Sequence, residues 1–237
     1  TLISAIYYCS LGAYYPTIFF IGFSSFIIFG DLLLNHDDKT QNYKYPLWLD
    51  IPIYINLPLL ILFLMMVVFV FSKSGSSFLS LIFLNYLNID LLSFRDSINL
   101  VDKISLVALS SLFIGIMGTV PGHELSHRIN NKYDLFIGSW LLSLSWDCAF
   151  AIEHVYGHHK NVALPKDPAT ARRGDNIYLF IINAIISEQR DAWQIEKKRL
   201  KSKSLHVLGL NNKLIKGYMK SISTVSYTHL TLPTICS

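Results

Sequence analysis

Residues 51–72 read IPIYINLPLLILFLMMVVFVFS and contain no Asp, Glu, Lys or Arg. A second uncharged run covers Thr1–Gly30. Each run exceeds the roughly 20 residues that a helix needs to cross a hydrocarbon core of about 30 Å. Neither run has the basic start and the small-residue cleavage site of a secretory signal peptide. We therefore predict an integral membrane protein.

The composition of the whole chain agrees with this prediction. Of the 237 residues, 52% are hydrophobic and 15% are charged, whereas a soluble domain carries about 25% charged residues. The apolar runs at 15–34 and 104–120 are also long enough to be spans. Polar residues interrupt the run at 78–94, which predicts a short interfacial or re-entrant helix. The predicted fold class is all-α, a polytopic membrane helical bundle.

The basic residues are concentrated in one segment. Ten of the twenty Lys and Arg residues lie between Lys160 and Lys203, together with five Asp and Glu residues. Loops rich in Lys and Arg beside membrane spans stay in the cytoplasm, so we expect this segment to face the cytoplasm. Because it follows hydrophobic runs directly, we expect contact with membrane lipid and no nucleic-acid partner.

Histidines cluster in two short motifs, HELSH (123–127) and EHVYGHH (153–159). Their members are His123, His127, His154, His158 and His159. On a helix, residues four positions apart face one way, and neutral imidazoles at that spacing suit a first-row metal. HELSH alone matches the H-E-x-x-H pattern of zinc proteases, with Glu124 as the base. Five histidines exceed the three that a catalytic zinc needs, so we expect two metals or one very His-rich site.

The apolar run 135–152 constrains how the two motifs can meet. A straight helix of this length would cross the membrane and leave His154 on the face opposite His127. Either the two motifs are unrelated, or the run lies in the cytoplasmic leaflet. Asp147 inside the run favours the second topology. Because Asp147 precedes His154 by seven residues, it would share a helical face with His154 and orient that ligand; a solvated interfacial Asp is the alternative.

Taken together, the motifs resemble those of a known family, the integral-membrane alkane 1-monooxygenases, which are non-haem di-iron hydroxylases. The resemblance rests on HELSHR (123–128), EHVYGHH (153–159), VALPKDPATARRG (162–174) and DAWQIEKKRL (191–200). It extends over roughly residues 15–205, and the second motif with its extension is its most specific part.

The resemblance implies a six-helix fold in the bacterial inner membrane, with a His-ligated di-iron centre that faces the cytoplasm. The two iron ions would be held by the five histidines, and O₂ would be the co-substrate. Electrons would come from rubredoxin and its NADH-dependent reductase, and a terminal methyl group of an apolar substrate from the bilayer would become a primary alcohol. Glu124 and Glu153 would orient neighbouring ligands, and Asp167 and Arg172 would fix the following loop by ion pairing.

Three alternatives stay open. Another His-box di-iron enzyme, such as a xylene-type hydroxylase or a fatty-acyl desaturase, would use the same ligands. A membrane zinc protease would need a third ligand besides His123 and His127, and it leaves the second motif unexplained. A metal-binding membrane scaffold would hold iron without O₂-dependent turnover.

The end of the sequence carries a further signal. VSYTHLTLPT (225–234) resembles the in-frame translation of a transposon-derived sequencing adaptor, and a Thr/Leu-rich tail is the alternative. We therefore expect residues 1–224 to be part of a membrane hydroxylase domain and 225–237 to be foreign. The resembling family has a later Glu-His-Tyr-Gly motif and an H-x-x-H-H box, which this sequence lacks. The 237-residue chain is accordingly expected to be inactive, with an incomplete metal site.

Overall fold

A computed structural model describes residues 1–34, 47–72 and 78–230. Helices, turns and bends account for all the regular structure in these ranges, so the predicted all-α class is confirmed. The chain divides into two compact units, Thr1–Met117 with Ser226–Ser237, and Gly118–Val225. Each unit is described by itself.

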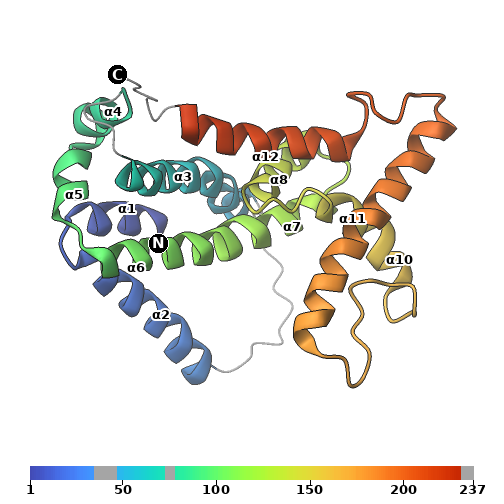
Figure 1. Cartoon of the computed structure of the whole chain (residues 1–237), viewed down its shortest axis with the longest axis horizontal. Coiled ribbons are helices and arrows are strands. Elements are labelled where there is room, and N and C mark those ends of the chain that lie inside the picture. Colours follow the sequence, from blue (N-terminus) through green and yellow to red (C-terminus); the bar gives the residue numbers. More distant parts are fainter. Residues whose placement is uncertain (35–46, 73–77, 231–237) are drawn as a thin grey trace. The chain divides into compact units, whose positions relative to one another are not determined.

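The first unit contains the first two predicted membrane spans and most of the third, coloured blue to green in Figure 1. Its helices are α1 (Leu2–Ser10), α2 (Tyr15–Leu33), α3 (Leu47–Phe71), α4 (Phe78–Leu87), α5 (Leu91–Ser97) and α6 (Leu100–Phe113). α2 packs on α1 and α6, and α3 packs on α1, α5 and α6. The core of this unit includes the fully buried rings of Phe63, Phe69 and Phe113.

Three helices are long and apolar enough to cross a membrane: Tyr15–Leu33, Trp48–Phe71 and Leu100–His127. The first two confirm the predicted spans 15–34 and 51–72. The third was predicted to end at Val120, before Pro121, but it continues to His127. A π-helical stretch, η1 (Ile114–Thr119), directly precedes α7 (Val120–His127). Pro121, the second residue of α7, has no N–H to donate to the preceding turn.

The run 78–94 forms two short helices instead of the predicted one. The break lies at Asn88, which has a left-handed φ of 55°. Asp90 then starts α5, because its Oδ1 accepts hydrogen bonds from the amides of Leu92 (3.0 Å) and Ser93 (3.2 Å). Such side-chain capping satisfies amides that have no partner inside the helix.

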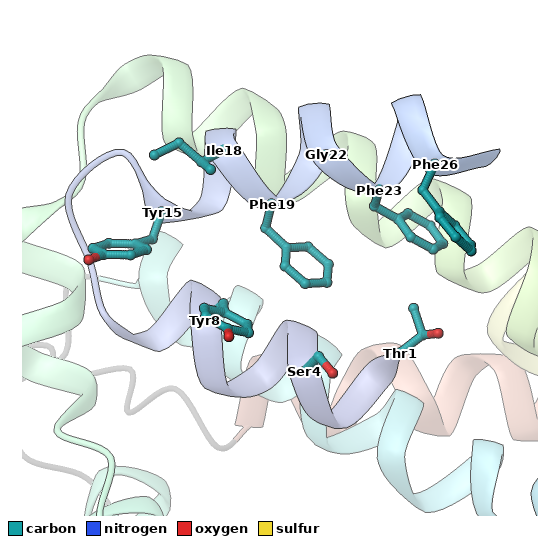
Figure 2. Close-up of a pocket in the computed structure, with 9 residues that line it drawn as sticks. All are labelled: Thr1, Ser4, Tyr8, Tyr15, Ile18, Phe19, Gly22, Phe23 and Phe26. Atoms are coloured by element: carbon teal, nitrogen blue, oxygen red, sulfur yellow. The ribbon is translucent and has the colours of Figure 1, made fainter. Parts of the chain in front are cut away.

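An apolar pocket of 460 Å³ lies between α1 and α2 (Figure 2). Aromatic rings line much of it, among them Tyr8, Phe19 and Phe23. Phe23 in turn contacts Phe113 of α6, with ring centroids 5.3 Å apart. The pocket therefore belongs to the packing of the spans in this unit.

The second unit carries both histidine motifs. Its elements are α7, α8 (Lys132–Leu144), α9 (Phe150–Glu153), η2 (His154–His158, π-helical), α10 (His159–Asn161), α11 (Ile177–Ser202) and α12 (Lys213–Leu230). α7 and α8 pack closely because each helix has a glycine at the contact, Gly122 and Gly138. A Cβ on Gly122 would lie 2.9 Å from Leu142 Cγ, and one on Gly138 would lie 2.9 Å from Leu125 Cβ. Close helix contact through small residues is common in membrane proteins.

The run 135–152 is not a single crossing helix. α8 ends at Leu144, residues 145–149 form turns, and α9 begins at Phe150. Trp146 in the break has a φ of 60°. The alternative of two unrelated motifs on opposite faces is therefore wrong. The premise for Asp147 is also wrong, because it lies in the break and shares no helical face with His154.

α11 and α12 pack behind the second motif through a small apolar core of Cys148, Ala149, Ile152, Ala192 and Leu214. The backbone of α12 is helical as far as Leu230. Of the segment 225–237, residues 231–237 lie outside the described residues. The predicted domain boundary at residue 224 thus stays a prediction.

Candidate metal centre

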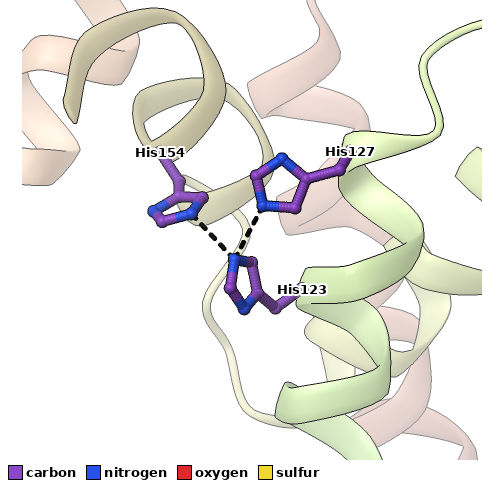
Figure 3. Close-up of side chains that lie close together, drawn as sticks. All are labelled: His123, His127 and His154. Carbon is purple, nitrogen blue, oxygen red and sulfur yellow. Dashed lines mark hydrogen bonds between the residues drawn. The ribbon is translucent and has the colours of Figure 1, made fainter. Parts of the chain in front are cut away.

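Three imidazoles from the two motifs point at one another (Figure 3). His123 and His127 come from successive turns of α7, and His154 comes from η2. The Nε2 atom of His123 lies 2.8 Å from that of His154 and 2.8 Å from that of His127. One possible ligand atom from each residue lies within 4.8 Å of the others. The break after α8 therefore lets motifs far apart in the sequence share one site.

A fourth imidazole joins through the π-turn. His159 Nε2 lies 3.1 Å from His154 Nε2, and the His159 amide donates to the His154 carbonyl, five residues earlier. On an α-helix, residues 154 and 158 would face one way, as the sequence predicted. The wider π-turn instead brings residues 154 and 159 together. π-Helical turns are often found at functional sites.

Hydrogen bonding alone does not account for these contacts. An imidazole nitrogen carries either one proton or one lone pair. His123 Nε2 contacts two other Nε2 atoms, and so does His154 Nε2. At most two of the three contacts can therefore be hydrogen bonds. Nitrogen ligands about 2.1 Å from a metal ion, at right angles, would lie about 3.0 Å apart, so this donor set fits a bound transition metal.

The surroundings keep His154 neutral and in place. Burial, together with the nearby His123, His159, His127 and His158, lowers the pKa of His154 to about 4. A neutral imidazole at physiological pH has a free lone pair for a metal. The Phe150 ring stacks on His154, with centroids 4.5 Å apart and planes 12° apart, and meets the edge of His123 at 5.3 Å. Sequence reasoning missed Phe150, because an aromatic residue in an apolar run carries no distinguishing signal.

His158 turns away from the four-imidazole group. Its Nδ1 lies 3.1 and 3.0 Å from the two carboxylate oxygens of Asp167. Asp167 is almost fully buried and also accepts hydrogen bonds from Thr170 Oγ1 and the Ala169 amide. Burial alone raises the pKa of Asp167, but these bonds outweigh it and lower the pKa. A carboxylate that holds Nδ1 leaves Nε2 available to a metal, as at many metal sites.

Asp167 and Arg172 were expected to fix the following loop by ion pairing. Asp167 pairs with His158. The Arg172 guanidinium instead donates to the Pro165 carbonyl at 3.4 Å, and the backbone amide of Arg172 donates to the Asp175 carboxylate at 2.8 Å. Both residues hold the loop, but the described contacts do not join them to each other. The loop thereby positions a candidate ligand.

Glu153 is buried against the π-turn. Its side chain is 3% exposed, and Oε1 accepts no hydrogen bond from the described residues. A Cβ on Gly157 would lie 2.5 Å from this oxygen, so glycine leaves the space that Glu153 fills. Burial, with the nearby carboxylates of Glu188 and Asp167, raises the pKa of Glu153 to about 7.

The remaining two acidic residues make other contacts. Glu124 is exposed and pairs with Arg128 at 3.5 Å. The Asp147 carboxylate accepts a hydrogen bond from the Phe150 amide, and burial raises its pKa. Asp147 thus holds the backbone of Phe150, a contact that its sequence spacing did not predict.

The fatty acid desaturase family model matches residues 104–231. This match covers more than half of the chain and includes both histidine motifs. The chain belongs to the fatty acid desaturase family. The match begins at residue 104, whereas the sequence resemblance was expected from about residue 15.

Within this family, the chain is similar to alkane monooxygenases. It is 36% identical over 110 residues to alkane 1-monooxygenase 1 of Pseudomonas aeruginosa, which is 46% of this chain and 28% of that protein. It is 35% identical over 128 residues to alkane 1-monooxygenase of Pseudomonas putida, 54% of this chain and 31% of that protein. The predicted resemblance is therefore confirmed.

A second kind of relative is also similar. The chain is 33% identical over 106 residues to the hydroxylase component of the xylene/toluene monooxygenase of Pseudomonas putida, 44% of this chain and 28% of that protein. The chain spans less than a third of the length of each of these relatives.

Proposed function

We propose that this chain is part of a membrane oxidoreductase that hydroxylates the terminal carbon of aliphatic chains with O₂. One observation carries the proposal. Imidazoles from two separate motifs converge in a set that hydrogen bonds alone do not satisfy, in a chain similar to alkane 1-monooxygenases. An inert C–H bond requires a redox-active metal, and bound iron would supply the redox change that zinc lacks.

We assign the metal ligands by contact. His123, His127, His154 and His159 would hold one iron through the Nε2 atoms that converge. His158, with Nδ1 held by Asp167, would serve a second iron together with further ligands. Glu153 and Arg172 would keep the π-turn and the loop in place. Glu124 supports this role less well, because its observed partner is Arg128.

Apolar surroundings suit an apolar substrate. Phe150 covers one face of His154 and would exclude water from that side of the metal. Three apolar spans connect the chain with the bilayer, into which an alkane partitions. We propose rubredoxin with its NADH-dependent reductase as electron donor, on the side of the basic segment 160–203, which would face the cytoplasm from the inner membrane.

The test uses membranes from cells that express the reading frame containing this chain. They receive octane, rubredoxin, rubredoxin reductase and NADH under ¹⁸O₂, and labelled octan-1-ol is measured by mass spectrometry. We expect product with the unaltered full reading frame and with the same frame carrying His206→Ala, an exposed histidine outside the site. We expect none with His123→Ala or His154→Ala. Equal product from all variants would refute the ligand assignment.

An alkyl-aromatic substrate is the second candidate, supported by the similarity to the xylene/toluene monooxygenase component. The same membranes supplied with m-xylene would then give 3-methylbenzyl alcohol faster than they give octanol from octane. A zinc protease fits less well, because Glu124 is paired with Arg128 and two further imidazoles join the HELSH pair. Peptide cleavage that depends on zinc would favour it.

A further inference from the structure

A second cavity in the Gly118–Val225 unit lies behind the second histidine motif. Its volume is 240 Å³, about eight times the ~30 Å³ that one water molecule occupies in the liquid. Side chains from α7, α8, α9, η2 and α12 line it. This volume accommodates a phosphate with its glycerol and leaves the longer part of a lipid outside.

Three lysines of α12 lie on this cavity: Lys213, Lys216 and Lys220. Their spacing of three and four residues places them on one face of the helix. The described residues that line the cavity include no Asp or Glu. The Glu196 carboxylate near Lys213 is already bound by Arg199 at 2.7 Å to each oxygen. The cavity is therefore a positively charged site for an anion.

Lys220 is the most enclosed of the three. Its Nζ donates to Ser139 Oγ and lies 5.4 Å from the ring centres of both Phe136 and Trp140. Burial is the main cause that lowers its pKa, and the neighbouring Lys216 adds to this effect. An anion in the cavity would offset the loss of solvent around this charge.

The lining also includes apolar side chains. Leu135 and Leu142 of α8, and Ala151 and Ile152 of α9, line the cavity together with the lysines. Gly217 allows α12 to approach, because a Cβ there would lie 2.7 Å from Cys148 Cβ. A lining that holds both basic and apolar side chains matches a ligand that has both a charge and hydrocarbon.

The cavity also lies at the end of a membrane span. Ser126 lines it and is the penultimate residue of the candidate span Leu100–His127. The end of a span is at the level of the lipid headgroups. The exposed ring of Tyr156 and the half-buried ring of Trp140 are residue types enriched at that level.

We propose that this cavity binds the headgroup of an anionic phospholipid, with the phosphate diester among Lys213, Lys216 and Lys220 and the acyl chains along the α8–α9 wall. Basic pockets beside membrane helices bind anionic headgroups in this way. The bound lipid would brace α12 against the segment that carries Phe150 and His154. This site is independent of the proposed hydroxylase activity.

The test titrates the purified 237-residue chain, in a zwitterionic detergent, with dioctanoyl-phosphatidylglycerol. Native mass spectrometry gives the stoichiometry, and tryptophan fluorescence gives the affinity. We expect one lipid per chain and at least tenfold weaker binding of dioctanoyl-phosphatidylcholine. Removal of the three charges in K213Q/K216Q/K220Q is expected to weaken binding about 100-fold, because each lysine near an anionic lipid contributes roughly fivefold.

The matched control removes three exposed lysines away from the cavity, in K198Q/K201Q/K203Q, and is expected to change the affinity less than threefold. K213R/K216R/K220R keeps the charge and is expected to retain binding. Equal losses in both Gln triples would overturn the proposal, as would equal binding of phosphatidylcholine. Competition by sn-glycerol 3-phosphate at equal affinity would assign the cavity to a free phosphate ester instead. The phosphatidylcholine and sn-glycerol 3-phosphate measurements use the unaltered chain, so they test the lipid proposal even where a triple variant unfolds.

Discussion

The His159 imidazole meets the His154 imidazole five residues earlier, Nε2 to Nε2 at 3.1 Å. This contact exists because His159 donates its amide to the His154 carbonyl across a π-turn. The predicted partner at α-helical spacing, His158, binds Asp167 instead. The hydrogen bond that spans five residues instead of four thus decides which histidine joins the metal-binding group.

The first prediction concerns that choice of histidine. His159→Ala is expected to lower iron affinity at the convergent site at least ~10-fold, because it removes one of the four converging nitrogens. His206→Ala is the control, since His206 is exposed and accepts a bond from the Leu208 amide at 3.3 Å. Competitive titration with a chelator, after anaerobic loading with iron, checks the outcome. Unchanged iron affinity in His159→Ala would show that the α-helical pairing governs the site.

The second prediction concerns the space beside the π-turn. Gly157→Ala would place a methyl group 2.5 Å from Glu153 Oε1, and we expect a loss of about 1–3 kcal/mol in unfolding free energy together with weaker iron binding. Gly30→Ala is the control, because nothing lies within 4 Å of its added Cβ. Denaturation in detergent, followed by circular dichroism, measures both variants. A Gly157→Ala chain as stable as the control would mean that Glu153 moves freely.

The third prediction concerns the orientation of His158. Asp167→Asn keeps the size but loses the charge that holds His158 Nδ1 at 3.0 Å. We expect iron affinity at the ligand set that includes His158 to fall about 10–100-fold, the usual effect of losing such a partner. Asp175→Asn alters a carboxylate of the same loop, which binds the Arg172 amide, and is expected to leave iron affinity unchanged. Competitive titration with a chelator distinguishes the two variants, and equal affinities would contradict the assignment.

The fourth prediction concerns pH. Burial raises the pKa of Glu196, but hydrogen bonds from Arg199 and the Lys213 amide outweigh this effect, and the pKa falls below the ordinary 4.5. Its stabilising contribution is therefore complete above pH 4.5 and is lost as pH falls through the lowered value. Glu196→Gln is expected to cost about 2 kcal/mol of unfolding free energy at pH 7 and progressively less below pH 4.5. Asp96→Asn, in an exposed pair with Arg95, is the control and should have little effect. An equal deficit at pH 7 and pH 3 in Glu196→Gln would point to packing instead of charge.

The fifth prediction concerns the source DNA of residues 225–234. We expect one uninterrupted read across the locus to lack the codons for VSYTHLTLPT and to continue into a Glu-His-Tyr-Gly motif and an H-x-x-H-H box. A locus that encodes VSYTHLTLPT as read here would make this segment a natural part of the chain.

The sequence alone determined the class of the protein and predicted the residues of its metal site. An uncharged, apolar run that is long enough, as a helix, to cross the hydrocarbon core is stable in a bilayer and not in water. The spans at 15–34 and 51–72 therefore followed from composition. The spacing of the imidazoles predicted the five histidines as metal ligands, because few other residue types hold a first-row metal in such a pattern. The resemblance to alkane monooxygenases also rested on local motifs, which pairwise similarity confirms.

The tertiary structure alone decided how those residues meet. The break at 145–149 brings the two motifs together, and no local pattern required it, since Asp147 is the only charged residue in the run. Glu153 packs against Gly157 in the π-turn, and the orientation of His158 depends on a carboxylate nine residues away. Periodicity reports which face of a regular helix a residue occupies. It cannot report where a helix widens or stops, because packing against other segments sets those points.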